Sequence, residues 1–370
     1  MKPIIFWFFM TVSILGNSQI ATYLDIPYHS IDTVDQNLLS FDAYIPEISG
    51  PKPIIFYVHG GGWVSGDKSV FGKKMKLFTD MGYMFISINY RLSPIPYQLD
   101  NPDRVKYPQH PDDVARAIAY ILEQAQIYGG DTERVAIIGH SSGAHIVSLI
   151  MTDASFLNTY GHSPDEIKCL CSLDTGAYDI NLWLGSASDA TKELYTNAFS
   201  ADTLVRMQAS PAHNVDKSDN LASTLLVHQS TVKRIYISTL FADTLSKYGA
   251  IVKKISTDYS HGEINQKIGD FSTETSTEYT QEITDWFKEC LYNAVSTSEY
   301  EKSNLKIYPN PTSDFIKITE NAHYQVVNMQ GQTLMHGYGS KIEVRHLESA
   351  IYLLALKIGT KEYRELIFIE

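Results

Sequence analysis

The pattern of hydrophobic and polar positions divides the chain into two parts near residue 295. In the first part, short apolar runs alternate with segments in which apolar residues recur every three or four positions. Continuous apolar runs are typical of strands buried on both faces of a parallel sheet, and the spaced pattern is typical of covering helices. We interpret six apolar runs as strands: Ile54–Val58, Phe85–Asn89, Val135–Ile138, Ile167–Leu173, Leu225–Val227 and Ile251–Ile255.

The helical spacing is clearest over residues 112–128. There, apolar side chains between Val114 and Ala125 recur at steps of three or four and form one face. Further helices are expected over Thr239–Lys247 and Glu278–Leu291. Alternation of buried strands with amphipathic helices predicts an α/β fold, with a mostly parallel sheet and helices on both of its faces.

The second part has the pattern of a small all-β domain. Short alternating segments separated by Gly, Asn and Ser predict a β-sandwich. These segments are Phe315–Ile318, Tyr324–Asn328, Lys341–Val344, Tyr352–Lys357 and Glu365–Ile369. The polar stretch of residues 295–304 is typical of a linker. We therefore expect an α/β domain over residues 19–294 and a β domain over residues 305–370.

The first 18 residues have the features of a secretory signal peptide. Lys2 is followed by an apolar run from Ile4 to Leu15 and by the small residues Gly16 and Ser18. The run is shorter than the roughly 20 residues that a membrane span needs, and a buried first strand or helix is the alternative. We expect export of a mature chain without a transmembrane segment.

Composition and charge exclude two classes of protein. The 370 residues are 44% hydrophobic and 12% aromatic, which excludes a globally disordered chain. Lys+Arg 30 and Asp+Glu 42 give a net charge of −12 without a basic block, so we expect no nucleic-acid partner.

The cysteines predict neither a disulfide framework nor a metal site. Cys169 and Cys171 lie two apart on one predicted strand, where a bond between them would strain the chain. One of them could pair with Cys290, but free buried thiols are the simpler interpretation. No zinc-type spacing of cysteines or histidines is present, so no metal is expected.

A serine motif follows the strand Val135–Ile138. Residues 139–143 read Gly-His-Ser-Ser-Gly and lead into the helix-like segment Ala144–Met151. A sharp turn flanked by glycines would expose Ser141 beside the helix N-terminus, where negative charge is stabilised. A glycine-rich turn with an incidental serine is the plainer alternative.

A glycine motif follows the strand Ile54–Val58. Residues 59–63 read His-Gly-Gly-Gly-Trp and offer unhindered backbone N–H groups. Such donors stabilise the oxyanion that forms when a carbonyl is attacked, by roughly 3–4 kcal/mol for one donor. A phosphate-binding loop is disfavoured because the Lys-Ser/Thr ending is missing.

Together these motifs resemble serine esterases of the α/β-hydrolase superfamily, close to the hormone-sensitive-lipase-like and feruloyl-esterase-like carboxylesterases. The resemblance covers about residues 24–292 and includes residues 89–92 (Asn-Tyr-Arg-Leu) and 129–131 (Gly-Gly-Asp). It implies that Ser141 is the nucleophile and that the amides of Gly61, Gly62 and Ser142 form the oxyanion hole. It also implies that no cofactor is needed.

The general base implied by the resemblance is His261. Residues 261–265 read His-Gly-Glu-Ile-Asn and resemble the family's histidine loop after the last main strand. His140 and His145 flank the serine turn and point elsewhere, so we expect packing roles for them. We expect His59 to anchor its own loop.

Such esterases also use a carboxylate that orients the histidine, and this third member of the catalytic triad is less direct to assign. The family usually places it after the strand Leu225–Val227, where Val232 stands in this chain. Asp174, at the end of the preceding strand, is the favoured candidate, although an Asp that only caps a strand end is an equal alternative. Asp258 is second, and Asp179 is expected to be structural.

Residues 305–370 resemble the C-terminal sorting domain of type IX secretion cargo. The resemblance rests on residues 308–311 (Tyr-Pro-Asn-Pro), on the turn at residues 327–332 and on Ile351-Tyr352-Leu353. It implies the secretion machinery as a partner and a secreted or cell-surface protein. A carbohydrate-binding sandwich is the alternative, but this stretch has no Trp for a stacking face.

These features predict a secreted serine carboxylesterase acting through an acyl-enzyme. Acylated saccharides or short-chain esters are the expected substrates. Two alternatives remain at this point: an inactive binding protein of the same fold, suggested by Val232, and a peptidase or amidase.

Overall fold

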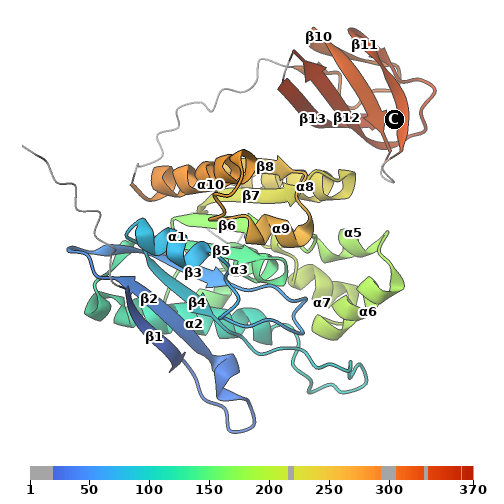
Figure 1. Ribbon diagram of the computed structural model, residues 1–370. Helices are drawn as coiled ribbons and strands as arrows, with labels where there is room; N and C mark the ends of the chain where they lie inside the picture. Colours follow the sequence, from blue (N-terminus) through green and yellow to red (C-terminus); the bar gives the residue numbers. More distant parts are fainter. Residues whose placement is uncertain (1–19, 216–220, 293–305, 329–331, 360, 370) are drawn as a thin grey trace, which may run out of the picture.

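The computed structural model describes residues 20–292 and 306–369, apart from residues 216–220, 329–331 and 360 (Figure 1). The predicted signal peptide of residues 1–18 and the predicted linker of residues 295–304 lie outside the described residues. Within the described ranges, no helix combines the length and the apolar character needed to cross a membrane.

Eight strands form one sheet in the order β1-β2-β4-β3-β5-β6-β7-β8. Their bounds are β1 Ile20–Pro27, β2 Ser40–Pro46, β3 Lys52–Val58, β4 Met84–Ile88, β5 Gly130–His140, β6 Cys169–Leu173, β7 Ser223–Gln229 and β8 Val252–Thr257. The strands from β4 to β8 in this order pair in parallel, whereas β1 and β2 are antiparallel at one edge. The predicted mostly parallel sheet is confirmed. β1 and β2 escaped prediction because β1 is largely exposed and Asp42 interrupts β2, so neither gives a continuous apolar run.

The helices expected over residues 112–128, 144–151, 239–247 and 278–291 are present as α2, α3, α8 and α10, with α2 beginning and ending three residues earlier and the other three longer than predicted. The bounds are α1 Lys74–Asp80, α2 Gln109–Ala125, α3 Ser142–Thr152, α4 Ser155–Asn158, α5 Ile180–Leu184, α6 Asp189–Ala198, α7 Thr203–Gln208, α8 Val232–Lys247, α9 His261–Gln266 and α10 Glu274–Tyr292. Helix α8 begins at Val232 instead of Thr239, which brings the start of this helix to the carboxyl edge of the sheet. Helices α5–α7 form an insertion between β6 and β7 that the periodicity did not indicate.

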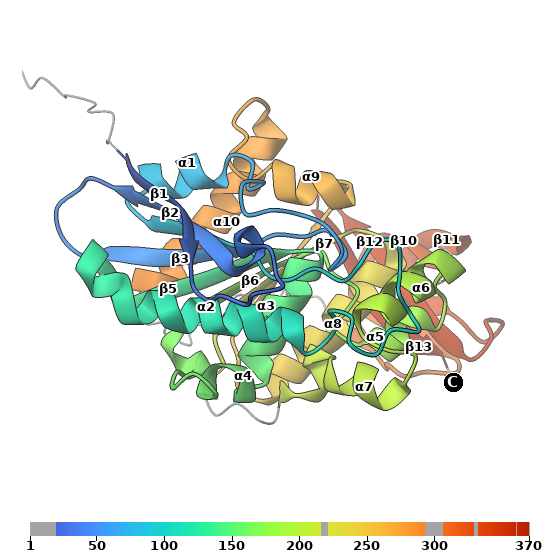
Figure 2. The same cartoon turned by 90° about the horizontal axis from the view of Figure 1, so that it is seen from below.

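Two apolar layers hold the helices against the sheet. On β3, Ile54, Phe56 and Val58 face one side and pack in the same core as residues of α2 and α3. Ile55 and Tyr57 face the other side, in a core shared with α1 and α10. Figure 2 shows these helices on opposite sides of the strands. Burial of each side chain of this size stabilises the fold by roughly 1.5–3 kcal/mol. The two layers therefore hold the strands in place, together with the loops that follow their ends.

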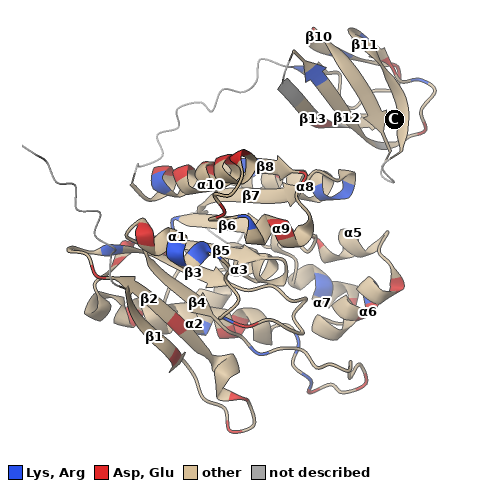
Figure 3. Ribbon diagram, in the orientation of Figure 1, with Lys and Arg blue, Asp and Glu red and all other residues tan. Residues whose placement is uncertain are grey.

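Charged positions are interspersed along the ribbon (Figure 3). Acidic residues occur on α2 and α10, and basic residues occur on α1 and α8. The net charge of −12 is therefore distributed over several elements instead of being concentrated on one.

A disulfide joins Cys169 on β6 to Cys290 on α10, with 6.1 Å between their Cα atoms. The expectation that all three thiols are free is wrong for this pair, and Cys171 is the free, buried cysteine. Cys169 and Cys171 face the same side of β6, as predicted, and α10 covers that side and brings Cys290 to Cys169.

The C-terminal part is all β, as predicted. Its strands are β9 Ile307–Tyr308, β10 Phe315–Val327, β11 Thr333–Glu343, β12 Ala350–Ile358 and β13 Lys361–Ile369. They form one antiparallel sheet in the order β11-β10-β12-β13, with β9 paired to β10, and not two separately hydrogen-bonded sheets. Two of the predicted segments are the single strand β10, which continues through a register shift between Lys317 and Ala322.

Candidate active site

Ser141 stands in a sharp turn between β5 and α3. Its backbone has φ 56° and ψ −116°, a conformation that is strained for a residue with a side chain. The flanking glycines make this turn possible. A Cβ on Gly143 would lie 2.2 Å from the carbonyl oxygen of Val58, and one on Gly139 would lie 2.5 Å from that of Gly143. The turn leaves Ser141 partly exposed beside the N-terminus of α3.

His261 follows β8 and is the first residue of α9. Ser260 and Glu263 cap this helix reciprocally and so fix where it begins. The Nε2 atom of His261 lies 2.9 Å from Ser141 Oγ, within reach for accepting the hydroxyl proton. The His261 side chain is 42% exposed, so the pair can be reached from solvent.

Asp174 follows β6 and is fully buried. One carboxylate oxygen, Oδ2, lies 2.6 Å from His261 Nδ1, and the other accepts the backbone N–H of Gln229 at 3.2 Å. Burial by itself raises the pKa of Asp174, but the hydrogen bond with His261 and the charge of Arg234 outweigh this effect. The pKa of Asp174 is held below its ordinary value, so the carboxylate is ionised at neutral pH.

The other carboxylates considered from the sequence have different partners. Asp258 accepts a hydrogen bond from Ser230. Asp179 caps α5 by accepting the N–H of Leu182. Val232 is the buried first residue of α8. Of the three candidate carboxylates, Asp174 is thus the one whose oxygen contacts the His261 ring.

The histidines beside Ser141 are held by backbone carbonyls. His140 Nε2 donates to the carbonyl oxygen of His261 at 2.9 Å, and His145 Nε2 donates to that of Ala209 at 2.7 Å. Burial lowers the pKa of His140 to about 3 and that of His145 to about 4, so both rings are neutral. Across the part of the chain that the structure describes, no cluster of His, Cys, Asp and Glu is arranged to hold a metal ion.

The glycine loop after β3 folds back on itself next to Ser141. Gly61 and Gly62 both have positive φ, and a Cβ on Gly61 would lie 1.9 Å from the carbonyl oxygen of Ser65. Ser142 is the first residue of α3, so its N–H has no acceptor within that helix. His59 donates from Nδ1 to the carbonyl oxygen of Gly60 at 2.8 Å and so fastens the start of the loop.

Comparison with known proteins places this arrangement in a family. Residues 41–237, more than half of the chain, match the model of the BD-FAE family. The chain belongs to the BD-FAE family. The match contains β2 to β7 with Ser141 and Asp174, and it ends before β8 and His261. Residues 306–370 match the secretion system C-terminal sorting domain, so the predicted sorting domain is confirmed and the protein is one for secretion or the cell surface.

Two curated relatives of this chain are ester hydrolases by name. The probable carboxylic ester hydrolase LipM of Mycobacterium tuberculosis is 35% identical over 104 residues, which are 28% of this chain and 22% of LipM. The probable isoprenylcysteine alpha-carbonyl methylesterase ICMEL1 of Arabidopsis thaliana is 32% identical over 171 residues, which are 43% of this chain and 33% of that protein. The chain thus spans only a fifth to a third of the length of these relatives.

Solved structures share the α/β-hydrolase fold of the BD-FAE domain. Esterase B from Lactobacillus Rhamnosis superposes with a TM-score of 0.58 at 17% identity, over 73% of this chain and 86% of that chain. A truncated carbohydrate esterase from gut microbiota superposes with a TM-score of 0.57 at 18% identity, over 73% of this chain and 95% of that chain. The predicted fold class is confirmed.

Tyr90 connects the glycine loop after β3 to the start of α3. Its buried hydroxyl lies 3.1 Å from the carbonyl oxygen of His59, to which it donates, and 3.3 Å from Ser142 Oγ. The ring also stacks on that of His59, with 4.6 Å between the centroids. The glycine loop and the start of α3 are therefore held at a fixed separation. The sequence placed Tyr90 in a family motif but gave no indication of these contacts.

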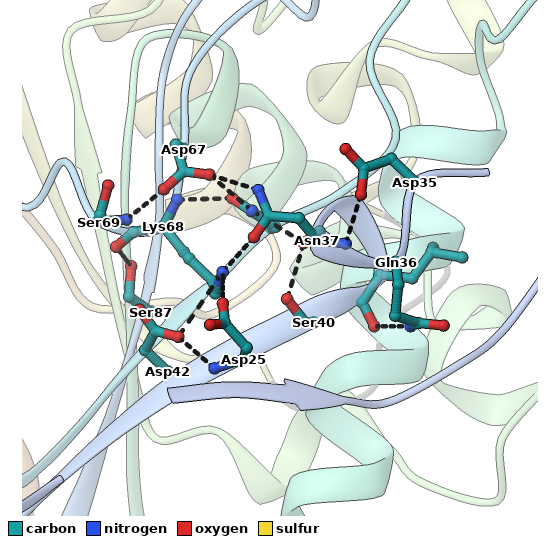
Figure 4. Close-up of polar contacts among 12 residues, drawn as sticks. Asp25, Asp35, Gln36, Asn37, Ser40, Asp42, Asp67, Lys68, Ser69 and Ser87 are labelled. Carbon is teal, nitrogen blue, oxygen red and sulfur yellow. Dashed lines mark hydrogen bonds and ion pairs between the residues drawn. The ribbon is translucent and has the colours of Figure 1, made fainter. Parts of the chain in front are cut away.

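A buried lysine, Lys68, fastens the chain that follows the glycine loop of residues 59–63 (Figure 4). Lys68 is 3% exposed, and its ammonium donates to Asp25 at 2.7 Å and to the side chain of Asn37. Its backbone N–H donates to Asn89 Oδ1 at 2.6 Å, and its carbonyl oxygen accepts the Ser87 hydroxyl at 2.6 Å. These contacts join the loop to β1, to the turn before β2 and to β4. A lone lysine in a polar loop carries no sequence signal for this role.

Proposed function

We propose that this chain is a secreted serine carboxylesterase in which Ser141 is the nucleophile, His261 the general base and Asp174 the acid. The observation that carries the proposal is the pair of contacts on the His261 ring, 2.9 Å to Ser141 Oγ and 2.6 Å to Asp174 Oδ2. Membership of the BD-FAE family and the named activities of the curated relatives support the same chemistry.

In the proposed mechanism, Ser141 Oγ attacks the ester carbonyl carbon while His261 Nε2 accepts the hydroxyl proton. Negative charge builds on the carbonyl oxygen, where the N–H groups of Gly61, Gly62 and Ser142 donate to it. The tetrahedral intermediate collapses, and the imidazolium returns its proton to the departing alkoxide. Water activated by His261 then releases the acid and restores Ser141.

Asp174 orients the imidazole in this mechanism and stabilises its cation. An acid after β6 replaces the one that the family usually has at the position of Val232. The close contact of Asp174 with His261 therefore favours an active enzyme over the alternative of an inactive binding protein.

The substrates that we propose are acylated saccharides or short-chain esters. Leu194 of α6 supports a short acyl group, because its side chain would lie 3.2 Å from a Cβ on Gly62 and so narrows the space beside the oxyanion hole. Secretion supports substrates that are found outside the cell.

Covalent labelling and product analysis test the proposal. A fluorophosphonate probe is expected to label the wild-type protein at Ser141 and to leave Ser141→Ala unlabelled, while Ser69→Ala, an exposed serine outside the site, labels normally. Hydrolysis of p-nitrophenyl acetate is expected to exceed that of p-nitroacetanilide. Faster cleavage of the anilide would support the amidase alternative, and no labelling would support the inactive binding protein.

The sorting domain gives a separate test of location. In a host with the type IX secretion machinery, the full chain is expected in the medium or on the cell surface. Deletion of residues 306–370 is expected to keep the enzyme inside the cell, as measured by immunoblotting the fractions. Equal release of both forms would reject the sorting domain as the export signal.

A further inference from the structure

Arg234 approaches Asp174 from the side opposite His261. The guanidinium Nε lies 3.5 Å from Asp174 Oδ1, whereas His261 contacts Oδ2 of the same carboxylate. Arg234 lies in the first turn of α8, the helix that begins at the position where the family usually has its acid. Its side chain is only 14% exposed, so water screens this ion pair weakly.

Trp183 of α5 completes a closed set of contacts around Asp174. The guanidinium carbon of Arg234 lies 4.5 Å from the centre of the Trp183 ring, and the Lys233 ammonium lies 4.0 Å from it. The same ring covers Gly176, where a Cβ would lie 2.3 Å from it. Gly176 follows Asp174 by two residues, so the chain from Asp174 to Gly176 is enclosed by Trp183 and Arg234.

This enclosure matters because the backbone of Asp174 is strained. Asp174 has φ 50°, a conformation that a residue with a side chain holds only when its surroundings enforce it. The Nη1 atom of Arg234 is buried and has no hydrogen-bond partner among the described residues. The guanidinium is therefore held by its ion pair and its stacking contact.

We propose that Arg234, stacked on Trp183, is a positioning residue that holds Asp174 in the orientation required by His261. The proposal rests on the function proposed above and assigns to α8 a part in catalysis without contact with the substrate. Arg234 also places a positive charge beside Asp174, which lowers the pKa of this carboxyl.

Steady-state kinetics of Arg234→Gln test the proposal. With a p-nitrophenyl ester, kcat is expected to fall by about 10- to 100-fold, since small misplacements of catalytic groups have effects of this order. KM is expected to change little. The acid limb of the pH–rate profile is expected to move to higher pH, because Asp174 loses a neighbouring positive charge that lowers its pKa. A residue that only stabilises the fold would not move this limb.

Two further variants separate charge from stacking. Arg234→Lys keeps the charge and loses the planar stacking group, so the acid limb is expected to stay in place while kcat falls. Trp183→Leu is expected to do the same. Arg206→Gln is the matched control, since this partly buried arginine of α7 bonds Ser200 and Thr196 instead of Asp174, and its kcat is expected to stay near the wild-type value.

The outcomes distinguish this proposal from the proposed function. Wild-type kcat and an unmoved acid limb in Arg234→Gln would overturn the positioning role, as would a raised KM with normal kcat, which would indicate a substrate-binding arginine. If Arg234→Gln does not fold, as measured by circular dichroism, unchanged kcat in Arg234→Lys and Trp183→Leu would overturn it.

An inactive wild-type protein would reject the proposed function instead. The low-field proton resonance of the His261–Asp174 hydrogen bond then still tests the positioning role, and an unchanged resonance in Arg234→Gln would reject it.

Discussion

Asp174 Oδ2 lies 2.6 Å from His261 Nδ1, although the two residues are 87 positions apart and follow different strands. Asp174 directly follows β6, and His261 begins α9 after β8. Parallel strands bring their carboxyl ends to one edge of a sheet, and this edge also carries Ser141 after β5. A carboxylate that follows β6 can therefore contact His261 although the position after β7 lacks one.

Replacement of Asp174 by Asn is expected to lower kcat on the order of 10⁴-fold while the protein stays folded. The amide preserves the shape of the side chain but removes the charge that stabilises the His261 cation. Ester hydrolysis and circular dichroism measure the two effects. Asp258→Asn is the control, and a larger loss of activity in this variant than in Asp174→Asn would reassign the acid.

Replacement of Lys68 by Met is expected to lower the free energy of unfolding by about 3 kcal/mol, because Asp42 then remains buried without its cation. Lys68 Nζ lies 3.7 Å from Asp42 Oδ1, and the Asp42 side chain is 6% exposed. Urea unfolding measures the loss. Lys288→Met, which removes an exposed lysine paired with Asp285, is expected to have little effect. Equal stability of the two variants would contradict the prediction.

The stability of the wild-type protein is expected to rise with pH between about 7 and 10 because of Lys74. This lysine is fully buried, and burial lowers its pKa to about 7. The unfolded chain keeps the proton up to about pH 10.4, so it binds more protons than the folded chain in this window. Rising pH therefore favours the folded state.

Lys74→Met is expected to remove this rise, as measured by urea unfolding from pH 6 to pH 10. The variant also loses the hydrogen bond from Lys74 Nζ to the carbonyl oxygen of Asn265, so the slope with pH is compared and not the absolute stability. Lys76→Met, on an exposed position of the same helix, is expected to keep the wild-type slope. Parallel profiles for wild type and Lys74→Met would show that Lys74 does not titrate in this range.

Replacement of Cys290 by Ser is expected to lower the free energy of unfolding by about 2–4 kcal/mol, because the bond to Cys169 closes a long loop. The two cysteines are 121 positions apart. Unfolding of the wild-type protein with and without a phosphine reductant gives the same comparison. A melting temperature that the reductant leaves unchanged would argue against the bond.

The sequence predicted those parts of the site that depend on local pattern. The strand before Ser141, the glycines around it and the loop of His261 are continuous motifs that can be read from the sequence alone. Asp174 was recognised because it ends an apolar run. Arg234, Lys68 and the partner of Cys169 depend on contacts between distant segments. Hydrophobic periodicity shows which face of an element is buried but not which residue of another element meets it.

The disulfide between Cys169 and Cys290 predicts in which compartment the fold is completed. It connects β6, the strand that precedes Asp174, to α10. Such bonds form in oxidising compartments and not in a reducing cytoplasm. We therefore expect this bond to close after the chain has left the compartment of its synthesis, so that completion of the α/β fold follows translocation.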